Sequence, residues 1–128
     1  MTPAPAAVGK SLRNVTERTN NMYKIIKKDD GKLRKISPTK VAWNYITADI
    51  TQNISLAVTE AVEGYHEKEL CQYNRIYYVL EGKLAIKIED LQEELNIGDS
   101  LYISKGTEYE MSGIFKAVVV NQPAFKVE

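Results

Sequence analysis

Four glycines divide the middle of this chain into short runs of β-branched and aromatic residues. They are Gly82, Gly98, Gly106 and Gly113. The run at 75–80 reads Arg-Ile-Tyr-Tyr-Val-Leu, a composition that packs well on a pleated sheet. The run at 83–88 alternates apolar Leu and Ile with Lys and Ala, which places its larger apolar side chains on one face. Glycine adopts the backbone conformations of tight turns without steric cost. This spacing therefore predicts short strands joined by turns, as in a β-sandwich or β-barrel.

The same pattern extends over most of the chain and predicts an all-β fold. We expect strands at residues 22–27, 32–36, 41–47, 54–62, 75–80, 83–88, 91–97, 100–103, 108–111 and 114–121. Pro123 ends the last of them, since proline has no N–H for a ladder. A jelly roll suits roughly eight to ten strands. Residues 1–20 show no period and are expected to form an N-terminal arm, with residues 21–128 as the single β-domain.

Composition excludes several classes of protein. No run of about 18 apolar residues is present, so we expect no membrane-spanning segment. The first residues lack the apolar stretch of a secretion signal, and Cys71 has no second cysteine with which to form a disulfide. These features favour a cytoplasmic location.

Charge is distributed unevenly along the chain. Residues 1–40 contain ten Lys/Arg and three Asp/Glu, whereas residues 41–128 contain seven and fourteen. A basic segment of this kind either binds nucleic acid or an acidic partner, or lies against its own acidic barrel or a sister subunit. Tyr23 is the only aromatic residue among the first forty, which is poor for base stacking. We therefore expect no nucleic-acid partner, and a homodimer in which the arm crosses to the other copy.

The glycines also match two spaced motifs, G-x5-H-x-H-x(3,4)-E-x6-G and G-x5-P-x-G-x2-H-x3-N. The second motif aligns position by position with Gly98, Ser104, Gly106, Tyr109 and Gly113. The first ends at Gly82 and places Arg75 at the glutamate. These are the motifs of the cupin superfamily, which residues 64–122 resemble. The resemblance implies an RmlC-like jelly-roll barrel, also called a double-stranded β-helix.

The resemblance also implies what the barrel lacks. Cupin metals are held by three histidines and a carboxylate, but here Arg75 and Tyr109 stand at two of those positions. A guanidinium keeps its proton and does not ligate a cation. We therefore expect no metal and no cofactor at the cupin position, as in metal-free cupins such as the cupin-like protein of ethanolamine-utilisation operons. An unconventional metal site that uses His66, Glu69 and Cys71 is the alternative.

Strand parity suggests what the interior contains instead. Arg75 and Tyr77 share one strand face, and in the cupin register that face lines the barrel. Tyr109 would enter from the facing strand. An arginine with two tyrosine hydroxyls predicts a pocket for a small anion, because a guanidinium binds carboxylate or phosphate through paired hydrogen bonds. Alternatively, Arg75 pairs with a carboxylate such as Glu108 or Glu110 and only fills the barrel.

Three further residues are candidates for a site. His66 is the only histidine, the residue type most often used as a general base at neutral pH, so it is a candidate general base, with Tyr109 as the acid. Such a pair operates in sugar epimerases among the metal-free cupins; the alternative is a histidine in a charged surface loop. Trp43 is a candidate floor for a ligand pocket, or a core residue. Cys71 is either a nucleophile or a small packed side chain.

Three functions follow from these residues. The first, which we favour, is binding of a small anionic metabolite of carboxylate or sugar type in the barrel. The second is a metal-independent isomerase, epimerase or lyase that uses tyrosine and histidine as acid and base. The third is a non-catalytic structural subunit. An interior pocket beside Arg75 would favour the first two, and His66 inside that pocket would favour the second.

Overall fold

The computed structural model describes residues 22–126, which form two antiparallel β-sheets. A short 3-10 helix, η1 (Lys28–Asp30), precedes them. The strands are β1 (Lys32–Ser37), β2 (Lys40–Ile46), β3 (Ser55–Ala61), β4 (His66–Leu70), β5 (Asn74–Gly82), β6 (Leu84–Ile88), β7 (Leu91–Leu95), β8 (Ser100–Ile103), β9 (Glu108–Ser112) and β10 (Phe115–Gln122). The predicted arm at residues 1–20 lies outside the described residues.

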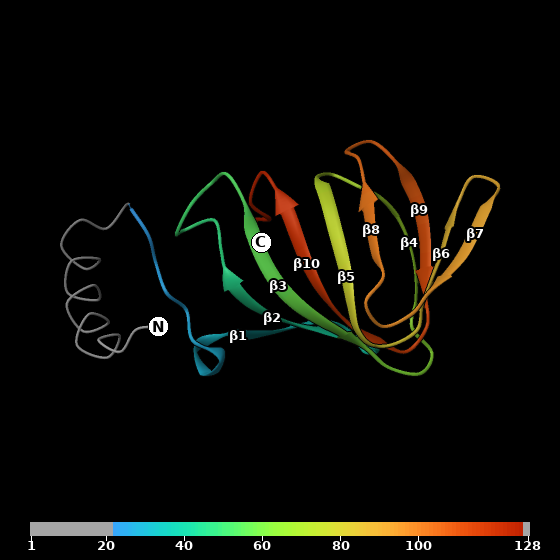
Figure 1. Cartoon of the computed structure of the whole chain (residues 1–128), viewed down its shortest axis with the longest axis horizontal. Helices are drawn as coiled ribbons and strands as arrows, with labels where there is room; N and C mark the ends of the chain where they lie inside the picture. The colour runs from blue at the N-terminus through green and yellow to red at the C-terminus, as the bar shows by residue number, and fades with distance from the viewer. Residues whose placement is uncertain (1–21, 127–128) are drawn as a thin grey trace, which may run out of the picture.

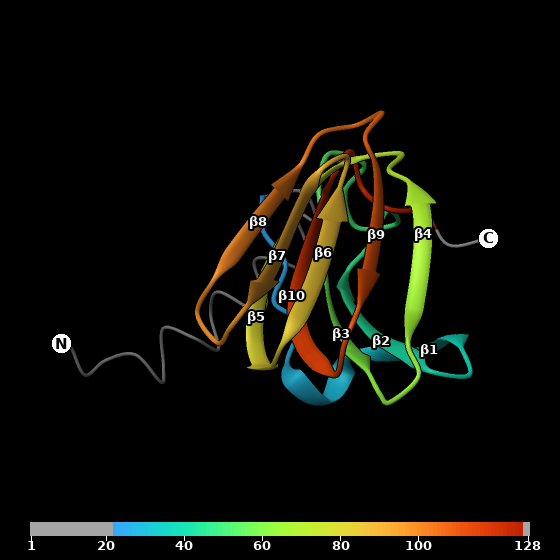
Figure 2. The same ribbon diagram turned by 90° about the vertical axis from the view of Figure 1, so that its right-hand side faces the viewer.

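The two sheets face each other as the halves of a jelly roll (Figures 1 and 2). One sheet has the strand order β1-β2-β3-β10-β5-β8, and the other has the order β4-β9-β6-β7. The expected all-β jelly-roll fold is therefore confirmed. Within residues 22–126, no helix has the length and apolarity that crossing a membrane requires.

Two of the strand predictions differ from the structure. Residues 22–27 are not a strand, and the segment after them forms η1 with Gly31 as its C-cap instead of a hairpin turn. Strand β4 was not predicted at all. Its sequence, His-Glu-Lys-Glu-Leu, is polar on both faces, and its two half-buried residues are Glu67 and Glu69. An inward face made of glutamates has no apolar alternation, so the periodicity that reveals the other strands is missing here.

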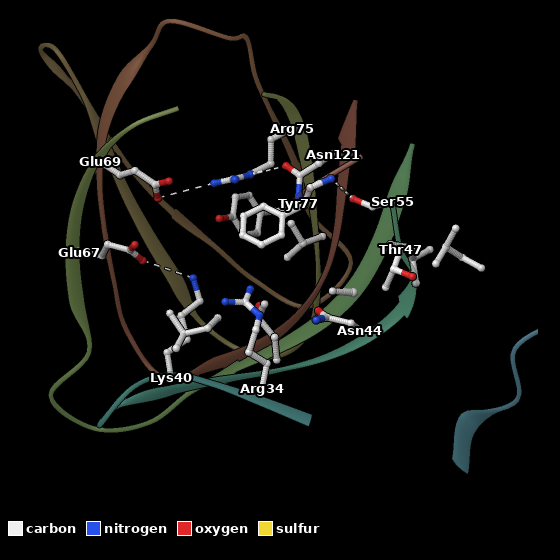
Figure 3. Close-up of a pocket in the computed structure, with 18 residues that line it drawn as sticks. Arg34, Lys40, Asn44, Thr47, Ser55, Glu67, Glu69, Arg75, Tyr77 and Asn121 are labelled. Carbon is white, nitrogen blue, oxygen red and sulfur yellow. Dashed lines mark hydrogen bonds and ion pairs between the residues drawn. The ribbon is translucent and has the colours of Figure 1, made fainter. Parts of the chain in front are cut away.

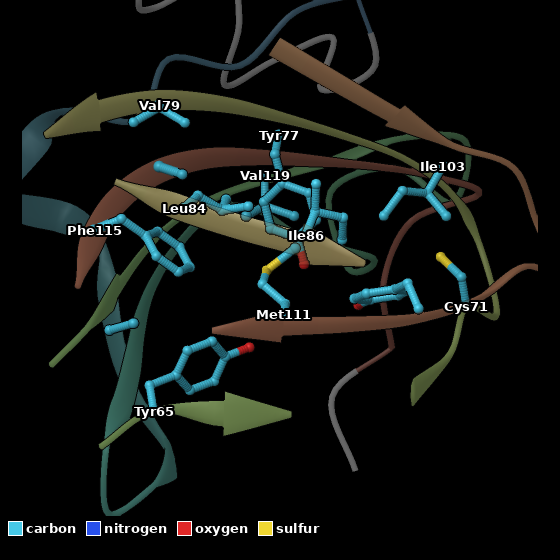
Figure 4. Close-up of a cluster of buried hydrophobic side chains, with 13 residues drawn as sticks. Tyr65, Cys71, Tyr77, Val79, Leu84, Ile86, Ile103, Met111, Phe115 and Val119 are labelled. Carbon is cyan, nitrogen blue, oxygen red and sulfur yellow. The ribbon is translucent and has the colours of Figure 1, made fainter. Parts of the chain in front are cut away.

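The apolar core fills one end of the space between the sheets (Figure 4). Its largest fully buried side chains are Tyr77, Leu84, Ile103, Met111, Val79 and Cys71. These residues belong to β5, β6, β8 and β9 and to the β4–β5 connection. Along β5, the alternation is complete, with Arg75, Tyr77 and Val79 buried and the residues between them exposed. At the other end, between β1–β4 and β10, charged and polar side chains stand among apolar ones.

Gly82 and Gly98 both occupy the left-handed region of backbone space, with φ of +77° and +91°. They differ in what surrounds them. A Cβ added at Gly82 would overlap the carbonyl oxygen of Ile114, the residue before β10, whereas one added at Gly98 would have nothing within 4 Å. Gly82 is thus required both for the turn and for close approach of two backbones.

Alanine substitutions of Gly82 and Gly98 give a matched test of the close backbone approach at Gly82. We expect Gly98→Ala to lower the free energy of unfolding by about 1 kcal/mol, the cost of placing a side chain at positive φ. Gly82→Ala should cost about 3 kcal/mol or more, because a backbone clash is added. Urea unfolding followed by circular dichroism measures both values. Equal losses in the two variants would contradict the close-approach argument.

Candidate functional site

A cavity of about 140 Å³ lies in the polar end of the barrel. Five charged side chains line it, namely Arg34, Lys40, Arg75, Glu67 and Glu69. Figure 3 shows them directed from opposite walls toward one another. The basic residues come from β1, β2 and β5 of the larger sheet, and both glutamates come from β4 of the smaller one. Because Glu67 and Glu69 are two residues apart on a strand, they share its inward face.

Arg75 is the centre of the first polar cluster and is only 5% exposed. Its Nε donates to Asn121 Oδ1 at 2.6 Å, and its Nη1 donates to the Tyr109 hydroxyl at 2.8 Å. That hydroxyl in turn donates to Glu69 Oε1 at 2.7 Å, and Nη1 lies 3.6 Å from the same oxygen. The carboxylate that pairs with Arg75 is thus Glu69, not Glu108 or Glu110.

The protonation states in this cluster follow from its geometry. Burial alone would lower the pKa of Arg75, but the neighbouring Tyr77 and Tyr109 and the Glu69 carboxylate raise it above its ordinary value. Burial also raises the pKa of Tyr109 well above its ordinary value. Arg75 is therefore a permanent cation and Tyr109 a neutral hydroxyl whose proton is committed to Glu69.

Lys40 is the centre of a second cluster with the same plan. Its Nζ donates to the Tyr65 hydroxyl at 3.2 Å and lies 3.4 Å from Glu67 Oε1. The Tyr65 hydroxyl donates to that oxygen at 2.5 Å. Burial alone would raise the pKa of Glu67, but Lys40 and Tyr65 outweigh it and hold the pKa below its ordinary value. In each cluster, a buried cation donates to a tyrosine, and the tyrosine donates to a glutamate.

Arg34 differs from the other two cations because no carboxylate within residues 22–126 forms an ion pair with it. Its guanidinium lies 4.9 Å from the centre of the Phe125 ring, and its Nε is buried without a hydrogen-bond partner. Burial lowers the pKa of Arg34. Thr59, which lines the same cavity, also has a buried hydroxyl without a partner. Buried polar groups of this kind cost free energy unless something hydrogen-bonds to them.

Sequence reasoning missed Arg34 and Lys40, although a signal was present. On β2, the inward positions are Lys40, Ala42 and Asn44, which alternate with Val41, Trp43 and Tyr45. The larger apolar side chains therefore face away from the cavity, and the small and polar ones face it. The alternate positions of β2 that carry the small and polar side chains would have identified Lys40 as a residue of the barrel interior.

Two predicted site residues lie elsewhere. The side chain of His66 is 59% exposed on the outward face of β4, with its Nε2 2.7 Å from Glu110 Oε2. Tyr109 is 2% exposed on the inner side, so the structure does not bring His66 and Tyr109 together as an acid–base pair. Trp43 lines a different hollow, on the outer face of the larger sheet, with Tyr45 and Val58. Arg75 and Tyr77 line the barrel cavity as predicted, and Tyr109 bonds to Arg75 beside it.

The side chains at the cupin metal position do not suit a metal ion. At the cupin metal position, Arg75 already pairs with Glu69 and Tyr109. Within residues 22–126, no group of three or more histidine, cysteine, aspartate or glutamate side chains is arranged to hold a metal ion. Cys71 is buried, and its thiol contacts the Tyr73 carbonyl at 3.1 Å, so it does not join Glu69 and His66 in a site.

The sequence can now be compared with known families. A family model described as ethanolamine utilisation protein EutQ matches residues 8–125. The chain belongs to the EutQ family. This membership, together with the similarity of its fold to an RmlC-like cupin from Shewanella frigidimarina, confirms the cupin resemblance. Among curated proteins, no sequence matches the chain significantly.

Solved structures place this EutQ family member among small jelly-roll proteins. A putative ethanolamine utilization protein Q from Salmonella typhimurium has a TM-score of 0.69 and 19% identity, over 80% of this chain and 88% of that one. The Clostridium difficile EutQ protein has a TM-score of 0.61 and 22% identity, over 79% and 75%. KdgF from a Halomonas species has a TM-score of 0.71 and 13% identity, over 80% and 96%. At these identities the similarity is one of fold.

The Arg75–Glu69 pair can be tested through stability. We expect Arg75→Met to lower the free energy of unfolding by roughly 3 kcal/mol or more, because it leaves Glu69 without its counter-charge and Asn121 without its donor. Adding Glu69→Gln should recover part of that loss, since the uncompensated charge is then removed. A double-mutant cycle from urea unfolding measures the coupling. Strictly additive losses would show that the two side chains do not interact.

Proposed function

We propose that this EutQ family protein binds a small anionic metabolite in the barrel cavity. The observation that carries the proposal is Arg34, a cation that faces the cavity with a buried, unpartnered Nε and no counter-carboxylate within residues 22–126. An arginine of this kind matches a carboxylate, because the Nε and Nη donors along one edge of the guanidinium bind two oxygens at once.

The balance of charge in the cavity supports the same conclusion. Arg34, Lys40 and Arg75 face Glu67 and Glu69, which leaves one positive charge in excess. Arg75 was the expected anion receptor, but its Nε and Nη1 are engaged by Asn121, Tyr109 and Glu69. The excess charge therefore belongs to Arg34. Arg75 acts as support for the wall of the site.

The cavity volume limits the ligand. About 140 Å³ is close to that of engineered protein cavities of about 150 Å³, which accept benzene. The ligand, or the part of it inside the barrel, is accordingly a group of only a few carbon atoms.

This reading is better supported than the two alternatives. The enzyme hypothesis relied on His66 as base and Tyr109 as acid, yet His66 is on the outer surface and the Tyr109 hydroxyl donates its hydrogen bond to Glu69. Similar folds include an ectoine synthase from P. lautus and the polyketide cyclase RemF, but at 14% and 17% identity they lend no residue to this site. A purely structural barrel would have no use for unpartnered buried donors.

Arg34 has a matched control on its own strand. Arg34→Ala should weaken binding of propionate at least tenfold relative to the unmodified protein, because the receptor for the carboxylate is lost. Arg34→Lys should keep the charge but lose the paired hydrogen bonds, and so weaken binding by a smaller factor. Lys35→Ala removes a neighbouring exposed cation and should leave binding unchanged. Isothermal titration calorimetry measures all four proteins. If the wild-type protein binds only cations or neutral compounds in these titrations, the proposal is rejected.

We further propose that the protein is a homodimer that pairs through the outer face of the larger sheet. Five apolar side chains are successive cross-strand neighbours on that face, namely Leu33, Trp43, Val58, Val118 and Tyr78. Leu33 is 64% exposed and Tyr78 45% exposed. Tyr102, 62% exposed, extends the apolar area onto edge strand β8. A contiguous apolar area of this kind usually marks an interaction surface.

The dimer proposal is tested by charge insertion. Tyr102→Arg places a charge on the outer face without disturbing the core, and light scattering at micromolar concentration should then report a monomer. Leu91→Arg is the control, since Leu91 is 51% exposed on the other sheet and should leave the dimer intact. A monomeric wild-type protein would contradict the proposal.

A further inference from the structure

The two glutamates that face the cavity each use one oxygen within the protein. Glu67 Oε1 accepts from Tyr65 and lies beside Lys40, and Glu69 Oε1 accepts from Tyr109. Within residues 22–126, no N–H or O–H group donates to Oε2 of either glutamate. The two carboxylates are also neighbours that interact with each other. The two carboxyl groups therefore offer hydrogen-bond acceptors to the cavity, in addition to the donor that Arg34 offers.

A ligand that hydrogen-bonds to Arg34 and to the two glutamates needs two kinds of group. Arg34 requires an acceptor, which a carboxylate supplies. Glu67 and Glu69 line the same cavity and require a hydrogen-bond donor. A second negative charge on the ligand would be repelled by these carboxylates, so the ligand carries one negative charge only. The donor is then a hydroxyl or an ammonium group.

The charge balance distinguishes the two donors. The cavity has one positive charge in excess, contributed by Arg34. A hydroxy acid brings one negative charge and neutralises it, whereas an amino acid is a zwitterion and leaves the excess in place. From this we infer that the ligand is a small hydroxy monocarboxylic acid, held by its carboxylate at Arg34 and by its hydroxyl at Glu67 or Glu69. The inference rests on the proposed function and adds the ligand's chemical class to it.

Three isosteric probes separate the possibilities. Propionate, lactate and alanine differ at one carbon, which bears hydrogen, hydroxyl or ammonium. Titration calorimetry at neutral pH should show lactate binding at least tenfold more tightly than propionate, because a hydroxyl bonded to a carboxylate adds about a factor of ten or more. Alanine should bind more weakly than lactate. Equal affinity for lactate and propionate overturns the inference but leaves the proposed function standing. Tightest binding of alanine overturns it in favour of an amino acid. Binding of none of the three overturns the proposed function itself.

Glutamine variants then assign the hydroxyl contact. Glu67→Gln and Glu69→Gln keep the size of each side chain but replace a charged acceptor with an amide. At least one variant should reduce the preference for lactate to below threefold while propionate still binds, because the Arg34 contact is kept. Glu108→Gln changes an exposed glutamate and serves as the control, with the preference intact. A preference that survives in both Glu67→Gln and Glu69→Gln overturns the inference. Should either variant fail to fold, the wild-type comparison of the three probes still decides it.

Discussion

Two buried cations joined to two glutamates hold the polar end of this barrel together. Arg75 and Lys40 stand on the larger sheet, and Glu69 and Glu67 stand on the smaller one. Each cation–glutamate pair is completed by a tyrosine hydroxyl that accepts a hydrogen bond from the cation and donates one to the carboxylate. Charges removed from water need such partners, because leaving one of them alone costs several kcal/mol. The pairs therefore join the two sheets beside the apolar core, to which both tyrosines belong.

The same pairs determine which groups are left for a ligand. With Arg75 and Lys40 compensated, Arg34 is the remaining cation, and the second oxygen of each glutamate remains an acceptor. The cavity is thus polar on both sides but has one net positive charge. This chain has Arg75 at the position where the cupin motif has a carboxylate, and that replacement is compatible with the anionic ligand that we propose. Members of one fold can differ in this way because the side chains that line the barrel vary independently of the strands that form it.

Local sequence was a good guide where one face of a strand is apolar. The alternation in β5 and β6 correctly predicted which residues are buried, including the inward direction of Arg75 and Tyr77. It failed where the inward face is polar, which is why β4 was missed and Glu69 was not recognised as the partner of Arg75. It also drew attention to Trp43, because a large aromatic residue suggests the interior, whereas β2 turns its aromatic side chains outward.

The sequence by itself determined the class of fold, the glycine turns, the membership of a cupin-like family and the presence of an arginine inside the barrel. These follow from local rules, namely strand alternation and the backbone freedom of glycine. Only the tertiary structure decided which charges meet. Arg75 and Glu69, like Lys40 and Glu67, pair because β4 folds across from β2 and β5, and hydrogen bonding depends on that distance and direction and not on proximity along the chain. For the same reason, only the folded barrel reveals that no carboxylate within residues 22–126 forms an ion pair with Arg34.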